Sequence, residues 1–348
     1  MLRIGKNLLK PRYYSTGSRP SHEIFDRSVK LQQKRLPLVQ TPEEFKNVQY
    51  LKNESIKKII STLSFINRKF KNTLDIGSSY GHLESLLASK PSSSVNTSIT
   101  GDESNEDEVF AKEVDMVKSK FKNIYMLDSC KEMLDMCDHK AEGLEFTKIH
   151  GDEESLDHEM LTNKKFNCII SNLCMHWINN LPEFLVKTYN LLDEKDSIFI
   201  GSMFAQDTLF ELRSSLQLAE MERKGGLSPH VSPFVTVQDL GNLLNRAGYK
   251  MVTIDIDEVV IDYPDLLTIM DELKLMGENN CLFEREPLSK ETLLAADPIY
   301  RKFYGVQDET GRTIYPATFR VLFFIGWRDK EIKSAKRGSQ NVDLKKIL

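Results

Sequence analysis

Short apolar runs alternate with amphipathic stretches through the middle of the chain. The apolar runs predict five buried strands, which end near Ile76, Asp128, Ile149, Asn172 and Phe204. Strands that alternate with helices in this rhythm are typical of a parallel, doubly wound sheet. The pattern therefore predicts an α/β fold whose ligands bind at the carboxyl ends of the strands.

Amphipathic stretches also flank this region. Two helices are predicted before the first strand, over 23–36 and 50–69, with Pro37 and Pro42 interrupting the first. The sequence leaves open whether they cover the ligand-binding edge or only pack. Beyond the fifth strand, the pattern predicts helices over 208–224, 238–247 and 265–276, and strands over 251–256, 258–263 and 319–327.

Composition places the chain among soluble globular proteins and singles out its first residues. The 348 residues are 40% hydrophobic and 28% charged, and no apolar run approaches the roughly 20 residues of a spanning helix. Residues 1–22 hold five basic residues, no acid and several hydroxyls. That composition predicts a mitochondrial transit peptide, with a basic tail as the alternative. Its removal takes the formal charge from −4 to −9, so a nucleic-acid partner is not expected.

A stretch rich in Ser, Thr and acids separates the first two predicted strands. Residues 91–115 have little to bury and are expected to form a disordered acidic insertion. The five cysteines form no Cys-x-x-Cys pair, which indicates packed, reduced thiols. The expected organisation is a transit peptide (1–22), N-terminal helices (23–70), a sheet-bearing core (71–204), a C-terminal part of the same domain with substrate-side helices (205–330) and a flexible tail (331–348).

A glycine turn follows the first predicted strand. Asp75, Gly77 and Gly81 give the spacing Asp-x-Gly-x-x-x-Gly at the start of a helix, where backbone N–H groups and the helix dipole favour a nucleotide-like ligand. The turn resembles the first motif of the S-adenosylmethionine (SAM)-dependent methyltransferases, with Ser79 in place of the middle glycine. Such turns also occur in α/β proteins that bind no nucleotide.

Polar residues end the neighbouring predicted strands as well. Asp128 lies 47 residues after Gly81, and without the 25-residue insertion the distance is 22, close to the roughly 20 residues expected for an acid that binds ribose hydroxyls. Asp152 follows the third strand, where it suits an adenine amino group, and Asn172 ends the fourth. With Asp75, Gly77 and Gly81, these residues predict a SAM pocket in a class I methyltransferase fold.

Longer stretches resemble one particular family. They are IFDRSVKLQQKR at 24–35, SNLCMHWINNLP at 171–182, GSMFAQDTLFELRSSLQLAEMERKGGLSPHVSPF at 201–234 and MGENNC at 276–281. Together they closely resemble the mitochondrial complex I assembly factor 5 family, described as protein-arginine hydroxylases on a methyltransferase-like fold. More distantly, the chain is similar to the malonyl-acyl-carrier-protein O-methyltransferases. It departs from the usual family pattern at Ser79 and at Asn167, where Asp is usual.

The resemblance implies a place and a target. It implies a matrix protein peripheral to the inner membrane, acting early in assembly of NADH:ubiquinone oxidoreductase (complex I). The implied partners are assembly intermediates and the subunit that lines the quinone site, of which one arginine would be hydroxylated.

Charged residues after the fifth strand are candidates for holding that arginine. Asp207 and Glu211, spaced i, i+4, are expected to share a helix face and grip a guanidinium, with Glu220 as a further candidate. His230 lies between two prolines, and His176 follows the fourth strand, so both are candidates for catalysis. For each of them, an ordinary structural role or a solvated helix face is the alternative.

Three functions remain open from the sequence. They are arginine hydroxylation, SAM-dependent methylation of a protein or acyl-carrier carboxylate, and a non-catalytic assembly chaperone. An iron site would need two histidines and a carboxylate. The required ligand types are present in His150 and Asp152, with His176 or His230 as the second histidine. Asp152 suits adenine better, however, and no metal is expected. The chain has no flavin or haem signature, so the oxidant for hydroxylation is unassigned.

Overall fold

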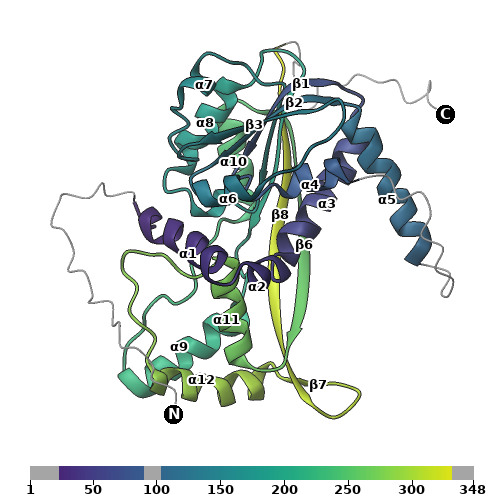
Figure 1. Cartoon of the computed structure of the whole chain (residues 1–348). Coiled ribbons are helices and arrows are strands. Elements are labelled where there is room, and N and C mark those ends of the chain that lie inside the picture. The colour runs from purple at the N-terminus through teal and green to yellow at the C-terminus, as the bar shows by residue number, and fades with distance from the viewer. Residues whose placement is uncertain (1–22, 90–102, 331–348) are drawn as a thin grey trace, which may run out of the picture.

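One twisted sheet connects the two halves of the protein (Figure 1). The computed structural model describes residues 23–89 and 103–330. Within them the sheet has eight strands in the order β3-β2-β1-β4-β5-β8-β6, with β7 paired to β8. The strands are β1 (Phe70–Ile76), β2 (Phe121–Asp128), β3 (Glu145–His150), β4 (Cys168–Asn172), β5 (Ser197–Phe204), β6 (Lys250–Tyr263), β7 (Val306–Gln307) and β8 (Thr313–Arg328).

The first five strands are parallel, and β8 runs antiparallel between β5 and β6. Every residue of β4 and β5 is buried, as expected for central strands covered on both faces. The five predicted strands and the parallel, doubly wound arrangement are thereby confirmed. Because these strands are parallel, their carboxyl ends meet at one edge of the sheet.

Helices cover both faces of the parallel strands. One face packs on α7 (Glu159–Thr162), α8 (Leu181–Leu191) and α10 (Val237–Ala247). The other packs on α3 (Tyr50–Ser64), α4 (His82–Ala88) and α5 (Glu103–Lys118). Short α6 (Lys131–Met136) and the 3₁₀ turn η1 (Met175–Trp177) follow β2 and β4.

Strands β6 and β8 extend beyond the parallel sheet and carry a second hydrophobic core. Helices α9 (Phe210–Lys224), α11 (Leu266–Met276) and α12 (Lys290–Phe303) pack there and form the lower half in Figure 1. Helices α1 (Arg27–Gln40) and α2 (Pro42–Asn47) lie between the halves, and α1 contacts both α6 and α11. Helix α1 therefore lies at the carboxyl edge of the parallel strands.

Several expectations were wrong in detail. Disorder was expected across 91–115; residues 91–102 lie outside the described residues, but from Glu103 the chain forms α5, which buries Val114 and Val117 in the core. Pro37 lies inside α1 instead of ending it. The two strands expected over 251–263 are one continuous β6. The predicted transit peptide (1–22) and tail (331–348) lie outside the described residues.

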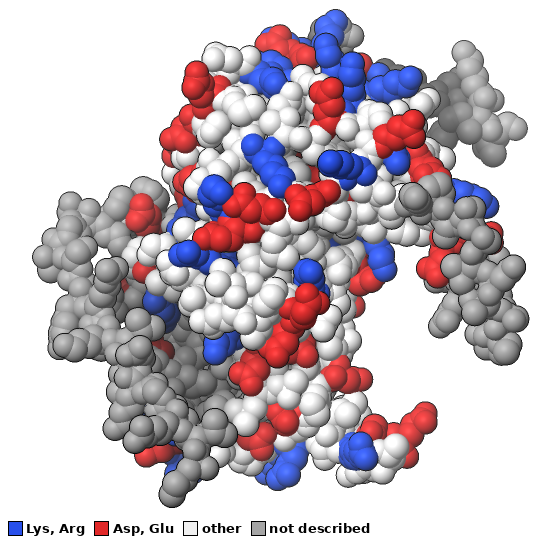
Figure 2. Space-filling view, in the orientation of Figure 1, with Lys and Arg blue, Asp and Glu red and all other residues white. Residues whose placement is uncertain are grey.

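The surface in Figure 2 carries acidic and basic side chains close together. None of the described helices is long and apolar enough to cross a membrane.

Candidate functional site

The glycine turn between β1 and α4 is tied to the end of β2. The N–H groups of Gly77 and Ser78 donate to the carbonyl of Leu127, and the Ser79 N–H donates to Asp128 Oδ2 at 2.9 Å. Gly77 has φ +73°, and a Cβ there would lie 2.4 Å from Cys174 Sγ. Ser79 has φ +57°, a region that non-glycine residues rarely adopt. The position where related motifs have glycine is thus one where a side chain carries backbone strain.

Asp128 lies at the centre of this arrangement. It is fully buried, and its second carboxylate oxygen, Oδ1, accepts from the Cys130 N–H at 2.8 Å. Burial raises the pKa of this carboxyl, while Lys34 acts in the opposite direction. Two backbone donors fix the carboxylate in place, so it is preorganised to accept hydrogen bonds from a ligand.

A pair of less satisfied acids lies beneath the turn. Asp75 and Glu84 are both buried. Among the described residues, Asp75 Oδ1 and both carboxyl oxygens of Glu84 have no hydrogen-bond partner. Burial raises the pKa of Glu84 to about 7. Burial also raises the pKa of Asp75, with further contributions from the charges of Glu84 and Asp128. Unpaired buried carboxyls of this kind favour a cationic ligand.

Helix α1 covers the acidic edge with two of its cations. Arg27 pairs with Asp152, Glu153 and Glu154. Lys34 Nζ lies 3.3 Å from Glu153 Oε1 and 4.0 Å from Asp128 Oδ1. Although burial opposes it, the charges of Lys34 and Arg27 lower the pKa of Glu153 to about 2. Glu153 is fully buried, so α1 is held by ion pairs that are largely shielded from water.

The residues predicted at the ends of the third and fourth strands have distinct surroundings. Asp152 is 48% exposed and lines an open cavity of about 520 Å³ with Phe25, Ser129 and Asn179. Asn172 donates to the Lys52 carbonyl and accepts from Ser202 Oγ. Asp152 therefore faces open space, although Arg27 and the N–H groups of Glu154 and Ser155 already donate to its carboxylate, whereas Asn172 is buried and has protein partners on both amide atoms.

His176 lies behind this edge, in η1. Its side chain is fully buried, and Nε2 lies 3.2 Å from Glu278 Oε2. The same carboxylate oxygen accepts from Trp177 Nε1 at 2.9 Å, and Lys52 Nζ lies 3.8 Å from Glu278 Oε1. Burial lowers the pKa of His176. The pKa of Glu278 is below its ordinary value because His176, Lys52 and Lys30 outweigh the effect of burial.

The candidates beyond β5 are not grouped as expected. Asp207 lies before α9, with φ +70°, and pairs with Arg320. Glu211 is buried and accepts from the N–H and Oγ1 of Thr318. The prediction that these two acids share a helix face is wrong, because Leu209 adopts a left-handed conformation and α9 begins only at Phe210. A left-handed residue at that point redirects the chain.

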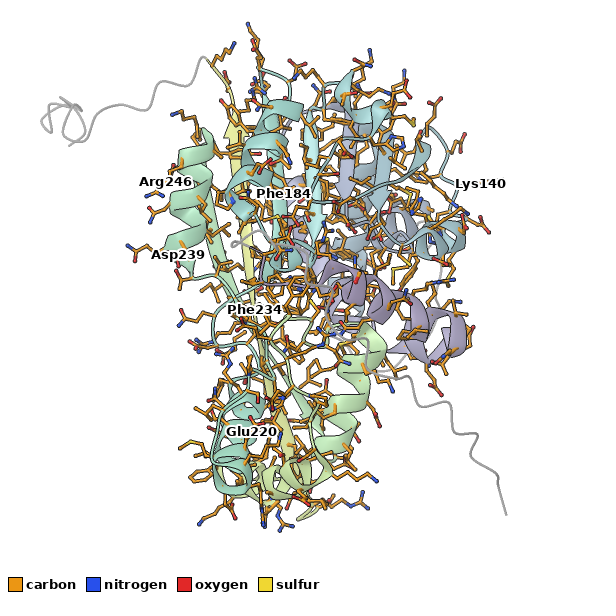
Figure 3. The ribbon with its side chains drawn as sticks, turned by 90° about the vertical axis from the view of Figure 1, so that its left-hand side faces the viewer. Lys140, Phe184, Glu220, Phe234, Asp239 and Arg246 are labelled. Atoms are coloured by element: carbon orange, nitrogen blue, oxygen red, sulfur yellow. The ribbon has the colours of Figure 1, made fainter. Side chains whose placement is uncertain are left out.

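His230 lies in the lower half of the molecule, where its Nε2 is 3.2 Å from Oε2 of Glu220 on α9. Figure 3 shows Glu220 within the lower half and Phe234 near the junction of the two halves. Glu220 also accepts from the N–H and Oγ of Ser228, so it fastens the loop after α9. The catalytic roles of His176, Asp207, Glu211 and His230 remain predictions.

Sequence reasoning missed the residues that link the halves. Arg27, Lys30 and Lys34 have the i, i+3, i+7 spacing of one helix face, a signal present in the sequence. Glu278 lies in the 276–281 stretch that the resemblance had singled out. Within the described ranges, no three His, Cys, Asp or Glu side chains are grouped so that they could hold a metal ion.

Comparison with known proteins agrees with this architecture. Residues 48–254 match the methyltransferase domain family. The chain is 37% identical over 339 residues to the mitochondrial arginine-hydroxylase NDUFAF5 of Danio rerio, covering 96% of this chain and 93% of that protein. The chain belongs to the mitochondrial arginine-hydroxylase NDUFAF5 family. It contains a methyltransferase domain.

Sequence similarity to this family extends beyond vertebrate relatives. The Dictyostelium discoideum arginine-hydroxylase NDUFAF5 is 33% identical over 350 residues, covering 97% of this chain and 72% of that protein. Among solved structures, the YcgJ protein of Bacillus subtilis aligns with a TM-score of 0.46 and 14% identity, over 80% of this chain and 99% of that one. The family assignment rests on the sequence relatives, since this structural similarity is weak.

Proposed function

We propose that the protein hydroxylates an arginine of another mitochondrial protein, the subunit that lines the quinone site of complex I, during early assembly of that complex. The observation that carries this proposal is similarity to arginine-hydroxylases NDUFAF5 over nearly the full length of both chains. The resemblance of the 201–234 and 276–281 stretches supports the same function. In this proposal the protein acts in the matrix, at the surface of the inner membrane.

SAM is the cofactor that the acidic edge fits best. Asp128 would hold the ribose hydroxyls, Asp152 the adenine amino group, and the Gly77–Gly81 turn the remainder of the ligand. Among the described residues, Asp75 Oδ1 and both Glu84 carboxyl oxygens have no hydrogen-bond partner, which suits a ligand with cationic groups. When bound, SAM supplies a sulfonium centre and an electrophilic methyl group. Because Lys34 lies 4.0 Å from Asp128 Oδ1, we infer that α1 shifts to admit the ligand.

Two alternatives each have an observation in their favour. The methyltransferase domain match over residues 48–254 favours methylation of a protein or acyl-carrier carboxylate. The buried ion pairs that hold α1 over the acidic edge favour a non-catalytic chaperone with a closed pocket. The three functions leave different marks on a target protein.

Mass spectrometry of the quinone-site subunit distinguishes them. The subunit would be isolated from cells that lack this protein and from the same cells with the protein restored. Hydroxylation adds one oxygen to an arginine, about 16 Da, whereas methylation adds about 14 Da. We expect the 16 Da addition only when the protein is restored. A 14 Da addition would establish methylation, and an unmodified subunit whose assembly still depends on the protein would establish the chaperone.

A further inference from the structure

Lys30 points away from water into a site built from other parts of the chain. It lies on α1 between Arg27 and Lys34, and it is 4% exposed. Its Nζ donates to the carbonyls of Gly277 and Asn279 at 2.9 and 2.7 Å. The same atom lies 3.3 Å from the centroid of the Trp177 ring. A lysine ammonium is therefore enclosed by an aromatic face and two carbonyl oxygens.

The surroundings of this ammonium would attract a cation. The carbonyls follow the C-terminus of α11, where the helix dipole is negative. The Glu278 carboxylate, held by Trp177 Nε1 and His176 Nε2 and lying 3.8 Å from Lys52 Nζ, adds a negative charge nearby. We call the Trp177 ring, the Glu278 carboxylate and the Gly277 and Asn279 carbonyls the cation cage. None of its walls comes from α1, although Gln33 of α1 donates to the Asn280 carbonyl in the same loop.

A guanidinium suits this cage better than an ammonium does. It is planar, stacks on an aromatic face and has five N–H donors for carbonyl and carboxylate acceptors. Burial lowers the pKa of Lys30 to about 8, whereas a guanidinium keeps its charge when buried. Exchange of Lys30 for a guanidinium would also leave the net charge of the buried group unchanged.

The position of the cage fits a substrate site. It joins η1, which follows β4 at the carboxyl edge, to the end of α11 in the lower half. On the lower side, a cavity of about 40 Å³ lined by His230, Phe234, Asn279 and Glu278 reaches the same loop. Arg27 and Lys34, on the same face of α1, cover the proposed cofactor acids. One movement of α1 would therefore uncover both sites.

We propose that the cation cage is the subsite for the guanidinium of the substrate arginine, and that Lys30 occupies it as an internal stand-in until α1 withdraws. The identity of the ligand as a substrate rests on the proposed arginine hydroxylation. The recognition of a guanidinium by the cage does not, and it can be measured without turnover.

Trp177 provides an optical signal for that measurement. The chain has two tryptophans, so a Trp327→Phe background leaves Trp177 as the sole reporter. The full chain would be titrated with Nα-acetyl-arginine methylamide and with the neutral citrulline analogue. We expect the arginine probe to change Trp177 emission at a concentration at least tenfold lower in Lys30→Met than in the parent with Lys30. The citrulline probe should cause no change, and adding Glu278→Gln should weaken the response at least tenfold.

The proposal is overturned if Lys30→Met keeps the circular dichroism and cooperative unfolding of the parent yet shows no response specific to arginine. Lys30→Arg is a second test that needs no vacated cage. It is expected to unfold at the same or a higher temperature than the parent, because a guanidinium fits the cage. A folded Lys30→Arg chain with a clearly lower midpoint would overturn the proposal as well.

Product analysis separates this inference from the proposed function. Arginine-specific binding without any 16 Da product in the target would support the cage and refute hydroxylation. Wild-type yield of that product in Trp177→Leu and Glu278→Gln chains would refute the cage while supporting hydroxylation.

Discussion

Glu84 offers a quantitative test of the acidic edge. Its side chain is fully buried in the first turn of α4, and both carboxyl oxygens lack a hydrogen-bond partner among the described residues. Burial raises its pKa from 4.5 to about 7. At about 1.4 kcal/mol for each pH unit, ionised Glu84 costs the folded state roughly 3 kcal/mol. Glu84→Gln preserves the shape of the side chain and removes this titration.

The direction of the effect follows from proton binding. Between about pH 4.5 and 7, folded Glu84 holds a proton that the unfolded chain has released, so the free energy of unfolding falls as pH rises. The stability of Glu84→Gln relative to wild type should therefore increase by roughly 2–3 kcal/mol between pH 5 and pH 8.5. Urea denaturation at intervals across this range measures the difference.

A matched control is available on the surface. Glu43→Gln replaces a glutamate whose side chain is 84% exposed, and its stability relative to wild type should stay nearly constant over the same range. A constant difference between Glu84→Gln and wild type from pH 5 to pH 8.5 would refute the conclusion that Glu84 is buried without a partner.

Three further comparisons test other parts of the site. Gly77→Ala should destabilise the fold by about 2 kcal/mol or more, because its Cβ would lie 2.4 Å from Cys174 Sγ and 2.5 Å from Cys174 Cβ. Denaturation should show partial recovery on adding Cys174→Gly, which removes both atoms, and no recovery would contradict this cause. Asp128→Asn should lower SAM affinity about tenfold or more in calorimetry, since it removes a buried charged acceptor, and unchanged affinity would remove Asp128 from the pocket. Glu211→Ala should lower the free energy of unfolding by about 2 kcal/mol, because it leaves the buried Thr318 N–H unpaired. Asp207→Ala breaks only a half-exposed ion pair with Arg320 and should lower it by less than about 1 kcal/mol. Urea denaturation measures both, and equal losses would contradict the assigned burial.

The sequence was sufficient where the signal is local. The central strands β4 and β5 are short runs of buried residues, and Asp128 ends β2, as the spacing from Gly81 indicated. The glycine turn was predictable because positive φ at Gly77 and Gly81 requires little more than the right residue type. Such features depend on neighbours in the chain and on the fixed geometry of a βα unit.

Long-range pairing escaped sequence reasoning. Arg27 and Glu153 are separated by 126 residues, and Lys30 and Gly277 by 247, so no local pattern specifies these contacts. The basic face of α1 was visible, but an exposed basic helix is the commoner interpretation of such spacing. The displacement of Asp207 from α9 depends on the left-handed backbone at Leu209, which a non-glycine residue seldom adopts.

The most direct test of the account uses one arginine and one carboxylate. Cells lacking the protein would receive the wild-type chain, Glu278→Gln, or the control Glu222→Gln, whose glutamate is 60% exposed. Tandem mass spectrometry would then locate and quantify added oxygen on the quinone-site subunit. The account predicts a 16 Da addition on a single arginine with wild type and control, and at least a tenfold lower fraction with Glu278→Gln. An unmodified or methylated arginine in cells with the wild-type chain would contradict it.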